Sequence, residues 1–228
     1  MLVKTYGSAV YGVDAITITV EVNVSQGIKF FLVGLPDNAV KESHQRIAAA
    51  LKNNGYRIPG KEITINMAPA DIRKEGSSYD LTLAMGILAA SGQVTKPELT
   101  EEYVIMGELS LDGELRPIKG ALPIAIKAQK EGFKGIILPA ANAKEAAIVE
   151  GLAVYGANNI KEVIDFFNGI NSMEKVTFDI QAEFENYDNL SGVDFADVKG
   201  QENVKRALEI AASGGHNAIV MGNYNTNN

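Results

Sequence analysis

The sequence predicts an α/β (α+β) domain at residues 1–168, a linker at residues 169–190 and the first elements of a second domain at residues 191–228. Two patterns lead to this prediction. Apolar and polar residues alternate strictly over residues 15–24, which is the period of a half-buried strand. From residue 121 onward, short apolar segments alternate with helical patterns, which indicates parallel strands joined by crossover helices. The first domain therefore begins with strands and continues with βαβ units.

The strand-rich first part is predicted from turn signals and apolar runs. A turn signal at residues 25–27 separates the first strand from an apolar strand at residues 28–33, so the two strands are predicted to form a hairpin. A helix is predicted to begin at Asp37 and to stop at Gly55. The other elements predicted in this part are a strand at 62–67, an apolar and therefore buried helix at 79–91, and a hairpin of strands 103–111 and 114–118.

The second part of the domain is predicted to alternate between helices and strands. Pro123 is compatible with this because it falls in the first turn of its helix. The elements are a helix at 121–131, a strand at 135–139, a helix at 143–150, a strand at 152–155 and a helix at 160–167. The segment that follows is rich in asparagine and acidic residues and breaks the pattern, which is typical of a linker.

Composition excludes several classes of function. The chain has 228 residues, of which 46% are hydrophobic, so it can bury a core. It has no cysteine and only two histidines, His44 and His216, which excludes disulfides and cysteine nucleophiles and leads us to predict no metal site. The net charge of −7 disfavours general affinity for nucleic acid. No apolar run has the length of a membrane helix and no signal peptide is visible, so we expect a cytoplasmic protein without membrane contact.

The C-terminal segment carries the beginning of a phosphate-binding pattern. An amphipathic helix is predicted at residues 203–212, and a short apolar strand at 218–221 leads into Gly222. A phosphate-binding loop needs such a junction of strand and glycine, followed by a second glycine and a lysine. Asn227 and Asn228 stand at the positions of that second glycine and that lysine. The alternative is that Gly222 only ends a strand.

The residues ahead of this strand carry a family resemblance. The run FADVKGQE at residues 195–202 resembles the first motif of AAA+ ATPases, and the run RALEIAASGGHN that follows resembles their Mg-chelatase-like branch, the ComM/YifB type. This resemblance implies ATP and Mg²⁺ as cofactors of the full-length protein, with Val198, Gly200, Gln201 and Gly222 at the nucleotide. It also implies a hexameric ring formed with copies of itself, and a role in DNA processing such as branch migration in competence or recombination. Neither cofactor is expected to bind to this chain by itself.

A second candidate site lies at residues 68–81, APADIRKEGSSYDL, just ahead of the predicted buried helix. Ser77 or Ser78 is expected to cap that helix by accepting backbone N–H bonds. The alternative is that Ser78 is a nucleophile held at the start of the helix. The charged residues of the segment are expected to form a solvated loop, with a docking surface as the alternative; they are Asp71, Arg73, Lys74 and Glu75.

The first domain also resembles the proteolytic domain of Lon proteases, which has a ribosomal protein S5 domain 2-like fold. The resemblance rests on the run GSS at residues 76–78 and the run RPIKGAL at 116–122, and it places Ser78 at the nucleophile and Leu122 at the lysine base. A serine without a base is only weakly nucleophilic, although Lys119 lies about one helical turn away. No catalytic residue is therefore predicted and Ser78 is a vestigial candidate. We expect the chain to be a non-catalytic oligomerisation or interaction domain, with a serine peptidase as the alternative.

Overall fold

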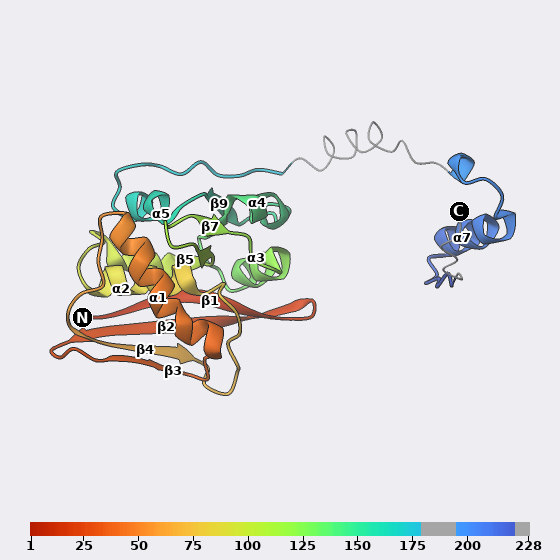
Figure 1. The fold of residues 1–228 in the computed structure, drawn as a ribbon. Coiled ribbons are helices and arrows are strands. Elements are labelled where there is room, and N and C mark those ends of the chain that lie inside the picture. The colour runs from red at the N-terminus through yellow and green to blue at the C-terminus, as the bar shows by residue number, and fades with distance from the viewer. Residues whose placement is uncertain (179–194, 222–228) are drawn as a thin grey trace. The chain divides into compact units, whose positions relative to one another are not determined.

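The computed structural model describes residues 1–178 and 195–221 (Figure 1). The chain divides into two units, Met1–Phe178 and Asp179–Asn228, and each is described here by itself. The first unit contains both sheets and most of the helices of the described residues, and the described part of the second unit contains one longer helix. None of the helices in the described ranges is long and apolar enough to cross a bilayer.

A seven-stranded sheet forms the framework of the first unit, in the order β3-β4-β2-β1-β5-β8-β9. β1, β2 and β4 are antiparallel neighbours, whereas β5, β8 and β9 continue the sheet from β1 as parallel strands. The predicted α/β class and the predicted parallel pairing are thus confirmed. The strands are β1 (Leu2–Tyr11), β2 (Asp14–Ser25), β3 (Phe30–Val33), β4 (Glu62–Ala68), β5 (Tyr103–Ile105), β8 (Gly135–Pro139) and β9 (Ala153–Ala157).

The predicted hairpin between the strands at 15–24 and 28–33 is wrong. β3 does not pair with β2, because β4 lies between them and pairs with both (Figure 1). The chain leaves β3 through helix α1 (Asn38–Asn53) and returns as β4 parallel to β3, which makes β3–α1–β4 a crossover unit. β2 instead forms its hairpin with β1, a strand that no periodicity had predicted.

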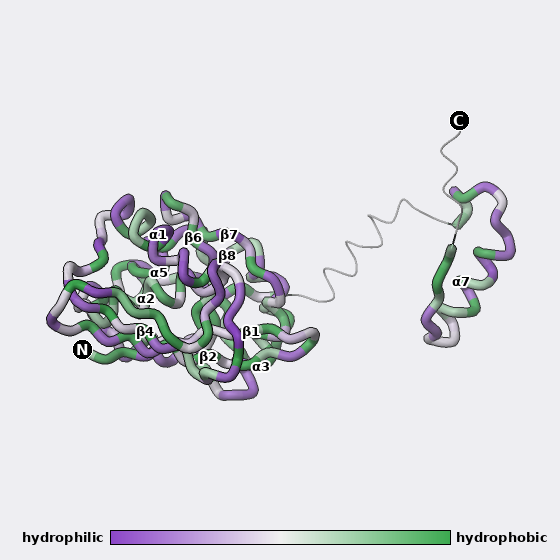
Figure 2. Tube along the Cα trace, turned by 60° about the horizontal axis from the view of Figure 1, so that its bottom comes forward, coloured by the Kyte–Doolittle hydropathy of each residue, from purple (hydrophilic) through white to green (hydrophobic). Residues whose placement is uncertain are grey.

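The helices pack on the sheet as the apolar patterns require. Asp37 caps α1 by accepting the N–H of Val40 at 2.8 Å, as its position at the helix start predicts. Every residue of α2 (Asp80–Ala90) is buried, and most of its tube has the colour of hydrophobic residues (Figure 2). α2 contacts β1, β2 and α1. The remaining helices of the first unit are α2 (Asp80–Ala90), the 3₁₀ helix η1 (Pro97–Glu102), α3 (Ala121–Lys130), α4 (Ala140–Ala146) and α5 (Ile160–Phe167).

Two predicted elements of the first unit differ from the structure. α4 begins three residues before the helix predicted at 143–150, because it starts directly after Pro139 ends β8. The strand predicted at 103–111 is broken in two, since the chain leaves the large sheet after β5. Its second part, β6 (Glu108–Leu109), forms the predicted hairpin with β7 (Leu115–Arg116) as a separate two-stranded sheet.

The second unit is described from residue 195 to residue 221. It contains the 3₁₀ helix η2 (Phe195–Asp197) and the amphipathic helix α7 (Glu202–Gly214), which confirms the helix predicted there. The strand predicted at 218–221 is wrong, because these residues have no regular structure. A strand requires a neighbour for its backbone bonds, and Ile219 and Met221 are 88% and 91% exposed in this unit instead of packed on one.

Candidate functional site

The candidate site lies where two neighbouring strands of the large sheet diverge. β1 pairs with β2 over its whole length, but its register with β5 consists of Tyr6 and Val104 alone. Beyond β5, the N–H of Met106 still bonds to Ile137 of β8 at 3.0 Å, and the N–H of Gly107 bonds to the carbonyl of Ser78 at 2.8 Å. The chain therefore turns away from β1 and leaves space beside the second half of that strand.

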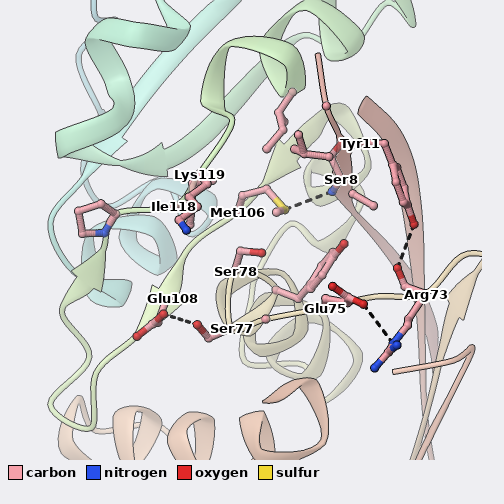
Figure 3. A pocket seen from close by; sticks show the side chains of 17 residues that line it. Ser8, Tyr11, Arg73, Glu75, Ser77, Ser78, Met106, Glu108, Ile118 and Lys119 are labelled. Carbon is pink, nitrogen blue, oxygen red and sulfur yellow. Dashed lines mark hydrogen bonds and ion pairs between the residues drawn. The ribbon is translucent and has the colours of Figure 1, made fainter. Parts of the chain in front are cut away.

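This space is a cavity of about 650 Å³ (Figure 3). One wall is the end of β1 from Ser8 to Tyr11 with Gly12, which follows it, and the opposite wall is the segment at 117–119 ahead of α3. The segment at 75–79 and Met106 form the base between them. The cavity thus brings together the GSS run and residues 117–119 of the RPIKGAL run, the two runs on which the Lon resemblance rests.

Ser78 lines the cavity and stands just before α2, as the sequence predicted, but neither serine caps the helix. α2 has no side-chain cap; the N–H of Asp80 bonds to the carbonyl of Ser77 at 3.1 Å, and the N–H of Leu81 bonds to Gly107 at 3.0 Å. The expected capping role is therefore wrong, because backbone carbonyls already accept these donors. The Ser77 hydroxyl instead donates to Glu108. The half-buried Ser78 hydroxyl has no hydrogen-bond partner among the described residues.

Lys119 and Leu122 lie in different surroundings. Lys119 lines the cavity together with Ser78, and Figure 3 places both side chains there. Within residues 1–178 and 195–221, Lys119 forms no ion pair, and no hydrogen bond joins it to Ser78. Leu122, at the position that the Lon resemblance gives to the base, does not line the cavity, and its backbone N–H donates to Glu145 at 3.0 Å.

A buried ion pair supports the base of the site. Arg46 of α1 donates to the two carboxylate oxygens of Asp80 at 2.7 and 2.9 Å and to the carbonyl of Ala39 at 3.0 Å. Asp80 is fully buried and also accepts the N–H of Leu109 at 3.2 Å. The hydrogen bond to Asp80 raises the pKa of Arg46; burial raises the pKa of Asp80, and the bonds from Arg46 oppose that rise. This pair fixes α1, the start of α2 and β6 to one another.

Lys74 contradicts the expectation of a solvated loop. Its side chain is 0% exposed, and its ammonium donates to the carbonyl of Gly34 at 2.8 Å and to that of Pro69. Burial lowers the pKa of Lys74. The N–H of Lys74 bonds to Leu35 at 3.2 Å, and its carbonyl accepts the N–H of Asp37 at 3.0 Å. Lys74 thus joins two loops, while the neighbouring Asp71, Arg73 and Glu75 are exposed as expected.

The residues that the AAA+ resemblance assigns to nucleotide lie around the start of α7. Gly200 and Gln201 both have left-handed backbones, with φ of 70° and 61°, and Gln201 directly precedes the helix. The N–H of Val198 bonds to Phe195 at 3.3 Å. All three predicted residues are exposed in this unit. Gly222, the fourth, lies outside the described residues.

Comparison with known proteins gives two family matches. The family described as "Subunit ChlI of Mg-chelatase" matches residues 20–142, more than half of the chain. The family described as "Magnesium chelatase, subunit ChlI" matches residues 194–226. The first match covers most of the first unit and the cavity residues from Arg73 to Ile124, but not the β1 wall of the cavity; the second match covers the segment around α7.

Individual relatives agree with these matches. The competence protein ComM of Haemophilus influenzae is 39% identical over 222 residues, which are 97% of this chain and 43% of ComM. The protein YifB of Escherichia coli is 42% identical over 94% of this chain and 41% of YifB. The DNA repair protein RadA of E. coli is 25% identical over 60% of this chain and 31% of RadA. This chain therefore spans about two fifths of the length of ComM and YifB.

Proposed function

Because this chain belongs to the Mg-chelatase-like family of AAA+ proteins, we propose that it is the N-terminal part of an ATP-dependent motor that processes DNA. The observation that carries the proposal is the similarity to ComM, a competence protein, over 97% of the chain. The weaker likeness to a DNA repair protein points in the same direction. Branch migration during competence or recombination is the activity that we assign to the whole motor, in the cytoplasm.

Within that motor, we assign different roles to the parts of the chain. Residues 1–168 are an interaction and oligomerisation domain without catalysis, which contributes to a hexameric ring of identical chains. Residues 169–190 are the linker, and residues 191–228 are the start of the nucleotide-binding domain, with Val198, Gly200, Gln201 and Gly222 at the nucleotide. ATP and Mg²⁺ are cofactors of the whole motor.

Residues 222–228 do not match the glycine and lysine positions of a phosphate loop. Asn227 and Asn228 stand where a phosphate loop has glycine and lysine, and an amide carries no charge to neutralise phosphate oxygens. We therefore assign the nucleotide chemistry to the whole motor. This division agrees with a role in interaction for the first unit.

The proposal is tested by DNA binding and self-association of this chain. Fluorescence anisotropy with labelled single-stranded and branched DNA, at low and then at moderate salt, determines whether the chain contacts DNA; phosphate contacts would weaken as salt rises. Sedimentation velocity determines whether it associates with itself. Self-association supports the interaction role. A chain that stays monomeric and binds neither DNA at low salt contradicts the proposal.

A serine peptidase is the second candidate, and the shared cavity of Ser78 and Lys119 is the observation that favours it. The hydroxyl of Ser78 has no hydrogen-bond partner among the described residues, and Lys119 of the RPIKGAL run lines the same cavity. A lysine can activate a serine only when it is close and neutral. Labelling by a fluorophosphonate probe that disappears in Ser78→Ala would establish this activity, and an unlabelled wild-type chain would remove it from consideration.

A further inference from the structure

The cavity exposes a strand edge whose backbone groups are available. β2 pairs with one side of β1 throughout, whereas β5 reaches the other side only at Tyr6. From Ser8 to Tyr11 this other side faces the cavity. In the described ranges, no further strand pairs with it. An unpaired edge of this kind is a template for another extended chain.

Ser8 shows which backbone groups point into the cavity. Its N–H, on the β5 side of the strand, donates to the Sδ of Met106 at 3.2 Å. A thioether sulfur is a weak acceptor, so this buried donor gains little from its partner. The N–H and C=O groups of alternate residues in a strand point to the same edge. Val10, two residues on, therefore directs its N–H and its C=O toward the cavity as well.

The side chains opposite this edge leave one cation without a partner. Glu108 is engaged by Ser77 and lies 3.8 Å from Arg116, and the exposed Arg73 is 3.2 Å from Glu75. Lys119 has no hydrogen bond or ion pair to any residue that the structure describes. A molecule in the cavity therefore meets a strand edge on one side and a free ammonium group on the other, next to the Ser78 hydroxyl (Figure 3).

We propose that this cavity binds an extended polypeptide segment of a partner protein that carries a carboxylate. The segment pairs with Ser8 and Val10 as an added strand and places its carboxylate beside Lys119 and Ser78. Main-chain hydrogen bonds supply affinity in such complexes, and side-chain subsites supply specificity. The volume of about 650 Å³ is in the range of ligand sites. The inference rests on the interaction role proposed above and names the class of partner.

Peptide binding tests the inference directly. The probes are two fluorescein-labelled ten-residue peptides of alternating valine and threonine, identical except for one central residue, glutamate in one and lysine in the other. We expect anisotropy to report binding of the glutamate peptide to the full chain, and roughly ten-fold weaker binding of the lysine peptide. Lys119→Glu reverses this preference. Lys130→Glu is the matched control, because Lys130 is an exposed lysine on α3 outside the cavity, and it leaves the preference unchanged.

Strand pairing is tested separately at Val10. Val10→Pro removes the N–H that faces the cavity, and proline is tolerated on the unpaired side of a strand. This variant is expected to bind the glutamate peptide roughly ten-fold more weakly than the wild-type chain does, while its own melting temperature stays near that of the wild type. If neither peptide binds the wild-type chain, the inference is overturned. Binding that Val10→Pro and Lys119→Glu both leave unchanged overturns it too, because the peptide then sits elsewhere. The sedimentation and DNA measurements on the same samples report on the proposed function independently.

Discussion

At the residue scale, the pairs that hold the site are buried and come from distant parts of the sequence. The apolar face of α1 could be predicted from its period, but the partner of Arg46 could not, because Asp80 is 34 residues away and a pattern contains no contact between them. The same holds for Lys74, whose charge predicted a solvated side chain. The structure buries it because two backbone carbonyls accept its ammonium protons.

Arg46→Leu is expected to destabilise the first unit by about 3 kcal/mol, because it leaves the carboxylate of Asp80 buried without its counter-ion. Urea unfolding followed by circular dichroism measures the loss. Adding Asp80→Asn to that variant is expected to restore part of it, since a neutral amide can still accept the N–H of Leu109. Lys134→Gln, in the exposed pair with Glu102, is the control and changes little. Equal effects of Arg46→Leu and Lys134→Gln would contradict this account.

His44 gives the first unit a dependence on pH. Its ring lies 4.3 Å from the ring of Phe30, and burial lowers its pKa below 6.5. Between the folded pKa of His44 and 6.5, the unfolded chain therefore binds more protons than the native chain. The stability that depends on neutral His44 is present above pH 6.5 and is lost as the pH falls through the folded pKa. The unfolding free energy is expected to decrease more between pH 7.5 and pH 5.5 in the wild type than in His44→Gln. An equal change of the urea midpoint with pH in the two proteins would refute this.

At the scale of elements, periodicity predicted nearly every helix and strand, but not which strands are neighbours. The helices that begin at Asn38, Asp80 and Ala121 were predicted because an apolar pattern has the same meaning wherever the helix packs. The hairpin of β2 and β3 failed because closeness in sequence does not reveal that β4 takes the place between them. The cavity could not be predicted for a related reason. It arises from the divergence of β1, which ends at Tyr11, and β5, which begins only at Tyr103, so the two strands are far apart in the sequence.

Close contact between α2 and β2 gives a further test at this scale. A Cβ at Gly86 would lie 2.7 Å from the Cγ2 of Val22, and valine is stiff at χ1. Gly86→Ala is therefore expected to destabilise the first unit by about 1 kcal/mol, because the overlap exceeds the gain in helix propensity. In a Val22→Ala background, the same substitution should be neutral or stabilising. Thermal unfolding of the four proteins of this cycle measures the coupling, and additive effects would contradict the contact.

At the scale of the whole molecule, each of the two units has its own family match, and each carries a different candidate site. The first unit provides a cavity with Ser78 and Lys119, and the second provides the turn at Gly200 and Gln201 ahead of α7. A local motif marked each of these two segments in the sequence, but the cavity that Ser78 and Lys119 share is seen only in the structure. The boundaries given for the domains remain predictions, as do the nucleotide contacts.

The 228-residue chain is expected to release no phosphate from ATP above a buffer blank, with Mg²⁺ present. The reason is that Asn228 stands at the position of the lysine that a phosphate loop requires. A coupled phosphate assay, calibrated with an unrelated ATPase, measures this. Hydrolysis that copurifies with the chain and persists after ion exchange would contradict the prediction.

The last residues described in the first unit have a mechanical consequence. The N–H of Val176 bonds to Val154 at 2.8 Å, and Lys175 forms a bridge with Tyr155, so the chain closes the outer side of β9 just before it leaves the unit. Met173 and Val176 also pack on the core. A pull transmitted along the backbone from beyond Phe178 would load this short pairing first and peel it open bond by bond. Tension along the backbone would therefore act on these contacts between residues 175–176 and β9 before it separates β9 from β8.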